Sequence, residues 1–273
     1  MTVADALRAA TQKLSETSDT ARLDAELLMA HALGAGRSDM LLRHMDANAP
    51  ACFAALVERR SRHEPVAYIL GEAEFFGRSF MVNPAVLIPR GDSESVVEAA
   101  LEVAPRDGRV LDLGTGSGAL LLTILAERRR LTGMGIDASL GALAVAAANA
   151  ARLGVGERAR MQRGDWREVD WAEELGRFDL VIANPPYVET AAQLDHTVRE
   201  FEPATALFAG PEGLDDYRII VPQLRGLLTE TGAAVLEIGS GQAEEVTQIA
   251  EESEFSVSLR RDLALRPRAL ILT

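Results

Sequence analysis

The chain has 273 residues, a net charge of −13 at pH 7, 48% hydrophobic residues and 25% charged residues. This composition excludes a disordered chain. The negative charge argues against extensive DNA contact, because basic side chains on phosphates supply most non-specific affinity. No apolar run approaches the roughly 20 residues that span a bilayer, the N-terminus does not resemble a signal peptide, and the single cysteine excludes an internal disulfide. We therefore expect a cytoplasmic protein without a membrane partner.

Residues 1–70 have the apolar spacing of amphipathic helices. One helical stretch centres on Leu7, a second is ended by Gly34, and a third begins after Pro50. We expect these stretches to pack into a small N-terminal helical bundle domain.

Residues 71–90 change to a strand-like pattern, with Phe75-Phe76-Gly77 at its centre. The Gly and Asn-Pro punctuation of this segment predicts a β-hairpin connector. A helix that opens at Asp92-Ser93-Glu94 then begins a third region, residues 91–273.

Strands and helices alternate through most of residues 91–273, which predicts a mostly parallel sheet covered by helices on both faces, an α/β fold of the Rossmann-like kind. Ligands of such sheets bind beyond the carboxyl ends of the strands. The expected strands are 110–113, 133–136, 159–162, 178–183, 233–238, a segment near 255–259, and 269–272, and the expected helices are 119–130, 140–153, 217–228 and 243–252.

A glycine-rich loop of Gly114, Thr115, Gly116, Ser117 and Gly118 joins the first strand to its helix. A tight turn alone would explain glycines here, but two details favour a ligand. The spacing is Gly-x-Gly-x-Gly, unlike the Gly-x-Gly-x-x-Gly of pyrophosphate sites. In addition, Asp112 precedes the loop, where a carboxylate would repel pyrophosphate and attract the ammonium of an aminoacyl group. The loop therefore favours S-adenosylmethionine over a dinucleotide.

Two further strand ends carry acidic residues that suit the same cofactor. Asp137 ends the second strand, where its carboxylate can accept both ribose hydroxyls or cap the next helix. Asp165 and Trp166 follow the third strand, where the Asp can accept from the adenine amine and the Trp can cover the ring. A Trp at such a position is also a common core residue.

The tetrapeptide Asn184-Pro185-Pro186-Tyr187 directly follows the apolar fourth strand. It can be a rigid turn, but successive prolines also leave the carbonyls of Asn184 and Pro185 without local amide donors. With the Asn184 side-chain oxygen they form a fixed set of acceptors for both N–H bonds of a planar nitrogen. Such acceptors stabilise the positive charge that develops on this nitrogen during methyl transfer, and Tyr187 can stack on the planar group. The tetrapeptide thus indicates a methyltransferase acting on an amide or a conjugated amine.

The four histidines are scattered without ligand spacing, so we expect no metal site.

These motifs make the chain resemble the HemK-type glutamine methyltransferases that modify peptide chain release factors, the PrmC family. The resemblance covers nearly the whole chain. It includes Glu64-Pro65-Val66-Ala67-Tyr68-Ile69-Leu70-Gly71, Glu74-Phe75-Phe76-Gly77, Val86-Leu87-Ile88-Pro89-Arg90, the glycine loop, the tetrapeptide and Phe201-Glu202-Pro203-Ala204-Thr205-Ala206-Leu207.

The resemblance implies a class I S-adenosylmethionine-dependent methyltransferase domain, with S-adenosylhomocysteine as product and no metal. The acceptor would be the glutamine of the Gly-Gly-Gln motif of class I release factors, and the N-terminal domain would help to hold that partner. Residues 114–118, Asp137, Trp166 and Asn184 would contact the cofactor, and residues 184–187 would hold the glutamine amide. We expect a monomer.

One segment departs from the family pattern, because Gly91-Asp92-Ser93-Glu94 stands where Pro-Glu-Thr-Glu is usual. Two alternative acceptors stay open. A glutamine of a ribosomal large-subunit protein is disfavoured by Phe201-Glu202-Pro203, since the sister enzymes carry His-Glu-Pro there. The exocyclic amine of adenine in DNA would require base flipping and a basic reading domain. A cofactor-binding scaffold without catalysis is disfavoured by the intact tetrapeptide.

Overall fold

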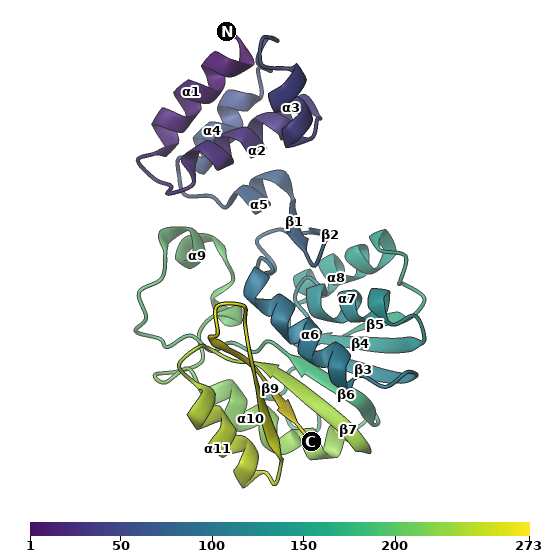
Figure 1. Ribbon diagram of the computed structural model, residues 1–273. Helices are drawn as coiled ribbons and strands as arrows, with labels where there is room; N and C mark the ends of the chain where they lie inside the picture. The colour runs from purple at the N-terminus through teal and green to yellow at the C-terminus, as the bar shows by residue number, and fades with distance from the viewer. The chain divides into compact units, whose positions relative to one another are not determined.

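The computed structural model describes residues 1–273 and divides into two compact units (Figure 1). The first comprises residues 1–72 and 194–201, and the second comprises residues 73–193 and 202–273. The segment 194–201 lies inside the region that the sequence pattern gives to the methyltransferase domain. It groups with the first unit, where the His63 and His196 ring centroids are 5.4 Å apart.

The first unit is a helical bundle around an apolar core that includes Leu14, Leu28 and Met29. Buried ion pairs complete it, since Asp24 accepts from the Arg60 side chain at 2.7 Å. The predicted bundle is present, and the short helices α3, α5 and α9 are additions to the predicted ones. The helices are α1 (Val3–Leu14), α2 (Ala21–Leu33), α3 (Arg37–Arg43), α4 (Phe53–Arg60), α5 (Val66–Leu70) and α9 (His196–Phe201).

The second unit begins with the predicted hairpin, β1 (Glu72–Phe75) and β2 (Arg78–Met81), and continues into a seven-stranded sheet. The sheet order is β5-β4-β3-β6-β7-β9-β8, with β9 antiparallel to both of its neighbours and the other pairs parallel. The sheet strands are β3 (Gly108–Leu113), β4 (Leu131–Asp137), β5 (Ala159–Arg163), β6 (Phe178–Ala183), β7 (Leu228–Glu237), β8 (Val257–Arg261) and β9 (Pro267–Leu272).

Alternating side chains of the central strands bury against different helices, which places the sheet between two helical layers (Figure 1). Val110 and Leu180 belong to the core shared with α6 and α7, whereas Leu111 and Val181 belong to the core shared with α10 and α11. The predicted α/β fold is therefore confirmed. The remaining helices are α6 (Glu94–Val103), α7 (Ala119–Glu127), α8 (Leu140–Arg152), α10 (Asp215–Leu227) and α11 (Ala243–Glu252), with 3₁₀ turns at Gly91–Ser93 and Ala204–Ala206.

The strand order reverses between β3 and β6, because the chain moves outward from β3 to β5 and then returns to the other side of β3. The glycine loop follows β3 and the tetrapeptide follows β6, so the two motifs meet at this reversal point. No helix in the structure is long and apolar enough to cross a membrane.

Candidate active site

A cavity of about 480 Å³ lies at the carboxyl ends of β3, β4 and β6, and its whole lining belongs to the second unit. Predicted site residues found in its wall are Gly114, Thr115, Gly116, Ser117, Asp137, Asp165, Trp166, Asn184 and Pro186. Predicted site residues that lie outside the wall are Asp112, Gly118, Pro185 and Tyr187. The fold thus brings together motifs that are up to about seventy residues apart.

The start of the glycine loop is fixed to the end of the neighbouring strand β4. The N–H groups of Gly114 and Thr115 both donate to the carbonyl of Ile136, at 2.8 and 2.9 Å. Gly114 has φ +74°, and a Cβ there would lie 3.2 Å from the Trp166 ring. Gly118, at the start of α7, has φ +81°. Both conformations disfavour residues with side chains, which explains the glycine spacing.

Asp112 lies behind the glycine loop. Its side chain is buried and accepts a hydrogen bond of 2.7 Å from the Thr115 hydroxyl. Burial, aided by the charge of Asp137, raises the pKa of the Asp112 carboxyl to about 7. In this conformation Asp112 supports the loop from below, and its contact with an ammonium group stays a prediction.

Asp137 fixes the loop from the opposite side. One carboxylate oxygen accepts from the Gly116 N–H and the other from the Ser139 N–H, each at 2.9 Å. The N-cap of α8 is Ser139, whose hydroxyl accepts from the Ala142 N–H at 3.2 Å. Burial raises the pKa of Asp137. Each oxygen of this carboxylate retains lone-pair capacity toward the cavity, which is compatible with hydroxyl donors.

Trp166 is both a wall of the cavity and a core residue. Its indole N–H donates to Asp216 at 2.7 Å, and Arg167 also donates to both oxygens of Asp216, at 2.7 and 2.9 Å. Asp216 on α10 was not identifiable from the sequence, because fifty residues separate it from Trp166. Asp165 accepts from the Arg167 N–H at 3.0 Å, which shapes the turn after β5.

The oxygen atoms at the start of the tetrapeptide accept no hydrogen bond from the protein. Asn184 is half-buried, and its side chain makes no hydrogen bond to the protein. The main-chain oxygens of Asn184 and Pro185 also receive no donor from the protein. Polar groups at the wall of a partly enclosed cavity ordinarily find partners. The Asn184 oxygens are therefore available to a bound donor, and Pro185 lies next to them outside the cavity wall.

Tyr187 does not line the cavity, and its side chain contacts a buried carboxyl. Its hydroxyl donates to Glu237 at 3.4 Å, and burial together with the Glu237 charge raises the pKa of this phenol well above its usual range. Burial raises the pKa of Glu237 to about 7, although the Ser93 hydroxyl and the Arg268 guanidinium nearby oppose the shift. The stacking of Tyr187 on a planar acceptor stays a prediction.

A buried carboxylate also holds the connector that follows the hairpin. Glu202 accepts from the Ile88 N–H at 3.1 Å and from the Arg90 guanidinium, and Arg90 lines the cavity. In the segment that departs from the family pattern, Asp92 pairs with Arg268 at 2.5 Å. The sequence alone shows Glu202 in a motif of the resemblance and Asp92 in the departing segment, and it indicates no partner for either acid.

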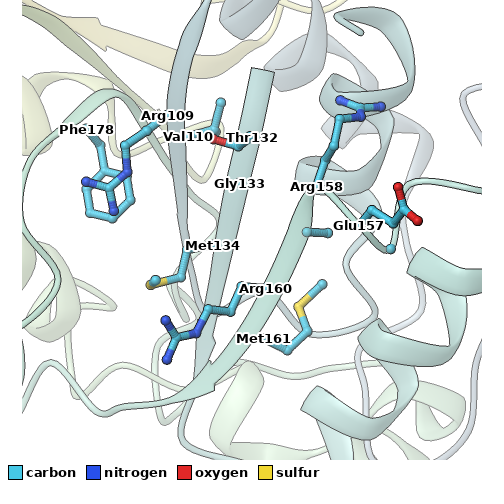
Figure 2. Close-up of a pocket in the computed structure, with 12 residues that line it drawn as sticks. Arg109, Val110, Thr132, Gly133, Met134, Glu157, Arg158, Arg160, Met161 and Phe178 are labelled. Atoms are coloured by element: carbon cyan, nitrogen blue, oxygen red, sulfur yellow. The ribbon is translucent and has the colours of Figure 1, made fainter. Parts of the chain in front are cut away.

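Within residues 1–273 no group of three or more His, Cys, Asp and Glu side chains is arranged to hold a metal ion. A second hollow lies at the amino ends of β3, β4 and β5, away from the glycine loop (Figure 2). Figure 2 shows its three arginines, Arg109, Arg158 and Arg160. The Arg109 guanidinium lies 4.4 Å from the centre of the Phe178 ring, and it donates to two main-chain carbonyls.

Two family models match the chain. The model described as the PrmC N-terminal domain matches residues 5–71, and the model described as the methyltransferase small domain matches residues 93–210. The matched ranges lie on either side of the hairpin β1–β2. They place a methyltransferase domain around the cavity described above.

Whole-chain relatives are release factor glutamine methyltransferases. The protein of that name from Nitratidesulfovibrio vulgaris is 40% identical, over 94% of this chain and 90% of its own length. The one from Cereibacter sphaeroides is 41% identical, over 98% of this chain and 97% of its own. Among solved structures, a methyltransferase from Pyrococcus furiosus shares the fold at a TM-score of 0.52 and 15% identity, over 72% of this chain and 89% of that one.

Proposed function

The chain belongs to the family of release factor glutamine methyltransferases, and from this premise we propose the reaction that it catalyses. The enzyme transfers a methyl group to the side-chain amide nitrogen of the glutamine in the Gly-Gly-Gln motif of class I peptide chain release factors. S-adenosylmethionine supplies the activated methyl group when bound, and S-adenosylhomocysteine is the product. The reaction takes place in the cytoplasm, with the enzyme acting as a monomer.

The observation that carries this proposal is the set of unused oxygens at the tetrapeptide. An amide nitrogen is a poor nucleophile because its lone pair is delocalised into the carbonyl, the resonance behind the rotation barrier of roughly 18–20 kcal/mol. The Asn184 side-chain oxygen and the main-chain oxygen of Pro185 accept no hydrogen bond from the protein. Accepting both N–H bonds of the glutamine amide orients its nitrogen and stabilises the positive charge that grows there.

The wall of the cavity has the chemistry needed for the cofactor. Gly114 and Gly116 would let backbone approach the ligand, Asp137 would accept the ribose hydroxyls, and Trp166 and Asp165 would border the adenine, since all five residues line the cavity. Gly114 suits a bound ligand because it has no side chain. A Cβ there would press on the Trp166 ring and narrow the space between the loop and that ring. Holding both reactants in one cavity supplies a proximity contribution that reaches roughly 7–11 kcal/mol in well-oriented systems.

No strong base is required by this arrangement. The nitrogen becomes acidic only as the methyl group arrives, so the amide proton can leave through the acceptor oxygens to solvent. Asn184 and Pro185 therefore act by position and charge. The first contribution to rate comes from orienting the nitrogen, and the second comes from stabilising its developing charge.

The experiment is methyl transfer from labelled S-adenosylmethionine to a purified recombinant release factor. We expect the label on the wild-type release factor and none when the Gly-Gly-Gln glutamine is replaced by alanine. Parallel reactions contain ribosomal large subunits or duplex DNA in place of the release factor. Label on either of these, with none on the release factor, contradicts the proposal.

A further inference from the structure

Tyr187 is held at two points, by the last residue of the neighbouring strand β7 and by a residue that follows it. Its carbonyl accepts from the Gln242 side-chain amide at 3.0 Å, and its hydroxyl donates to Glu237 at 3.4 Å. Glu237 ends β7, which pairs in parallel with β6 up to the residue before the tetrapeptide. Neither Gln242 nor Glu237 is among the residues that line the cofactor cavity, so both contacts support the tetrapeptide from outside the cavity wall.

The Gln242 amide joins three separate segments. Its nitrogen donates to the Tyr187 carbonyl and to the Gly213 carbonyl at 3.1 Å, while its oxygen accepts from the Gly239 N–H at 3.1 Å. Gln242 stands at the N-cap of α11 but makes no capping hydrogen bond with its side chain. Ser, Thr, Asp and Asn are favoured at that position because they satisfy the helix. Here the side chain is directed to the tetrapeptide instead.

Gly213 and Gly239 lie against the Gln242 side-chain amide, and neither position has space for a side chain. A Cβ on Gly239 would lie 2.6 Å from the Gln242 side-chain oxygen, and a Cβ on Gly213 would lie 2.7 Å from its nitrogen. Gly213 also has φ +70°, which residues with side chains rarely adopt. The surrounding backbone is thus built to the shape of the bridging side chain.

Glu237 is the second residue that holds Tyr187, through the Tyr187 hydroxyl. It is 1% exposed, and one of its oxygens, Oε2, is buried without a hydrogen-bond partner. A buried carboxyl with an unpaired oxygen is costly, and the Ser93 hydroxyl and the Arg268 guanidinium nearby offset this cost only in part, so the Glu237 carboxyl calls for a role. Its main-chain oxygen accepts from the Tyr217 hydroxyl at 2.7 Å, which fixes the end of β7 next to the tetrapeptide.

We infer that Gln242 and Glu237 are positioning residues for methyl transfer, acting through Tyr187 to keep the Asn184 and Pro185 oxygens in register with the acceptor amide. The inference rests on the proposed function. Neither residue lines the cofactor cavity, so neither touches the methyl donor. Their loss should reduce turnover while cofactor affinity stays as it is.

The decisive variant is Gln242→Met, which keeps the length of the side chain and removes all four of its hydrogen bonds, including a longer one of 3.4 Å to the Glu212 carbonyl. We expect kcat, per cofactor-binding molecule, to fall about tenfold or more, since small displacements of reacting groups can cost about a hundredfold. The Kd for S-adenosylhomocysteine by calorimetry should stay within about twofold of wild type, because the wall of the cavity is unchanged.

The matched control is Gln248→Met on the same helix, where the exposed amide contacts only Glu252 at 3.0 Å. Its kcat should equal that of the wild type. The contact of Glu237 is tested in the same way. Glu237→Leu should lower kcat, whereas Glu237→Gln should keep most of the wild-type kcat, because an amide oxygen can still accept from the Tyr187 hydroxyl. A loss of fold would instead remove cofactor binding in proportion to activity.

A Gln242→Met enzyme that keeps kcat within about twofold of the wild type overturns the inference. If Gln242→Met does not fold, Gln242→Glu gives the same test, because it keeps the acceptor to Gly239 and loses the donor to Tyr187. A wild-type enzyme that labels ribosomes or DNA and not release factor contradicts the proposed function alone. The same variants are then measured on whichever acceptor is labelled.

Discussion

The two hollows of the sheet differ in how their polar groups are used. The cavity at the carboxyl ends contains oxygens without donors, at Asn184, and a carboxylate with spare capacity at Asp137. The hollow at the amino ends has the higher density of formal charge, with Arg109, Arg158 and Arg160. The guanidinium groups of Arg109 and Arg158, however, donate hydrogen bonds to main-chain carbonyls of the protein itself.

This contrast teaches that unused hydrogen-bonding capacity identifies a site better than charge does. A buried group that has already found its partner stabilises the fold and offers little to a ligand. A group without one is either costly or functional. Substitutions at the two ends should therefore separate into those that change activity and those that change stability or nothing.

The largest effect should follow from Asn184→Ala. We expect kcat to fall about 10²–10³-fold, as for the loss of one charge-stabilising group in other enzymes. The free energy of unfolding should stay within about 0.5 kcal/mol of wild type, because this side chain makes no hydrogen bond to the protein. Single-turnover methyl transfer and chemical denaturation measure the two quantities. A fully active Asn184→Ala enzyme would remove the role given to this residue.

Asp112 should give a pH-dependent effect on stability. Burial raises its pKa from 3.8 to about 7, so between these values the folded state binds the proton more tightly than the unfolded chain does. Stability is therefore highest at low pH in this range and declines as pH rises toward 7. From about pH 5 to about pH 8 the wild type should lose about 2–3 kcal/mol more than Asp112→Asn does.

The measurement for Asp112 is denaturant unfolding of the cofactor-free protein at both pH values. Taking the difference between wild type and Asp112→Asn cancels the titrating groups that do not interact with Asp112, which leaves Asp112 and its coupling to Asp137. The substituted amide keeps an oxygen for the Thr115 hydroxyl, so the loop retains its support. Equal pH profiles for the two proteins would show that the Asp112 carboxyl is ionised throughout.

Asp137→Asn should weaken cofactor binding by about 10- to 100-fold, the usual range for a hydrogen-bonded charged group. Both carboxylate oxygens accept N–H groups, from Gly116 and Ser139, and an amide would turn a donor toward one of them. Calorimetric titration with S-adenosylhomocysteine gives the affinity. Asp107→Asn, on an exposed acid beside Arg130 near the amino-end hollow, is the control and should bind as the wild type does.

The elements and the carboxyl-end motifs were predictable because each motif directly follows a strand with a clear apolar pattern. The glycine loop after β3 and the tetrapeptide after β6 needed only local sequence and the rule that ligands meet strand ends. The alternation of apolar and turn residues likewise sufficed for the sheet and its helices. Short helices such as α3 and α9 lacked enough periodic residues to stand out.

The orientation of individual side chains was not predictable, because it depends on partners far away in the chain. Tyr187 turns toward Glu237, fifty residues later, and Arg90 pairs with Glu202 at a separation of 112 residues. Asp112 faces Thr115 and the interior because of the strand's alternation, a property that the loop pattern does not contain. Roles that depend on such pairings are set by the three-dimensional fold and not by local sequence.

The smallest effects belong to the amino-end hollow, where Arg158 and Arg160 form a matched pair on one segment. Arg158 donates to the carbonyls of Leu131 and Leu125, at 2.7 and 2.8 Å, and so closes the end of α7. Arg160 is exposed and makes no hydrogen bond or ion pair. Arg158→Ala should cost about 1–2 kcal/mol of stability, and Arg160→Ala should change it by less than about 0.5 kcal/mol. Methyl transfer should be unchanged in both, because neither side chain reaches the cofactor cavity. Lower activity in Arg160→Ala at wild-type stability would mean that the amino-end hollow binds something after all, and that its free guanidinium, like the free oxygens at the other end, is kept for a ligand.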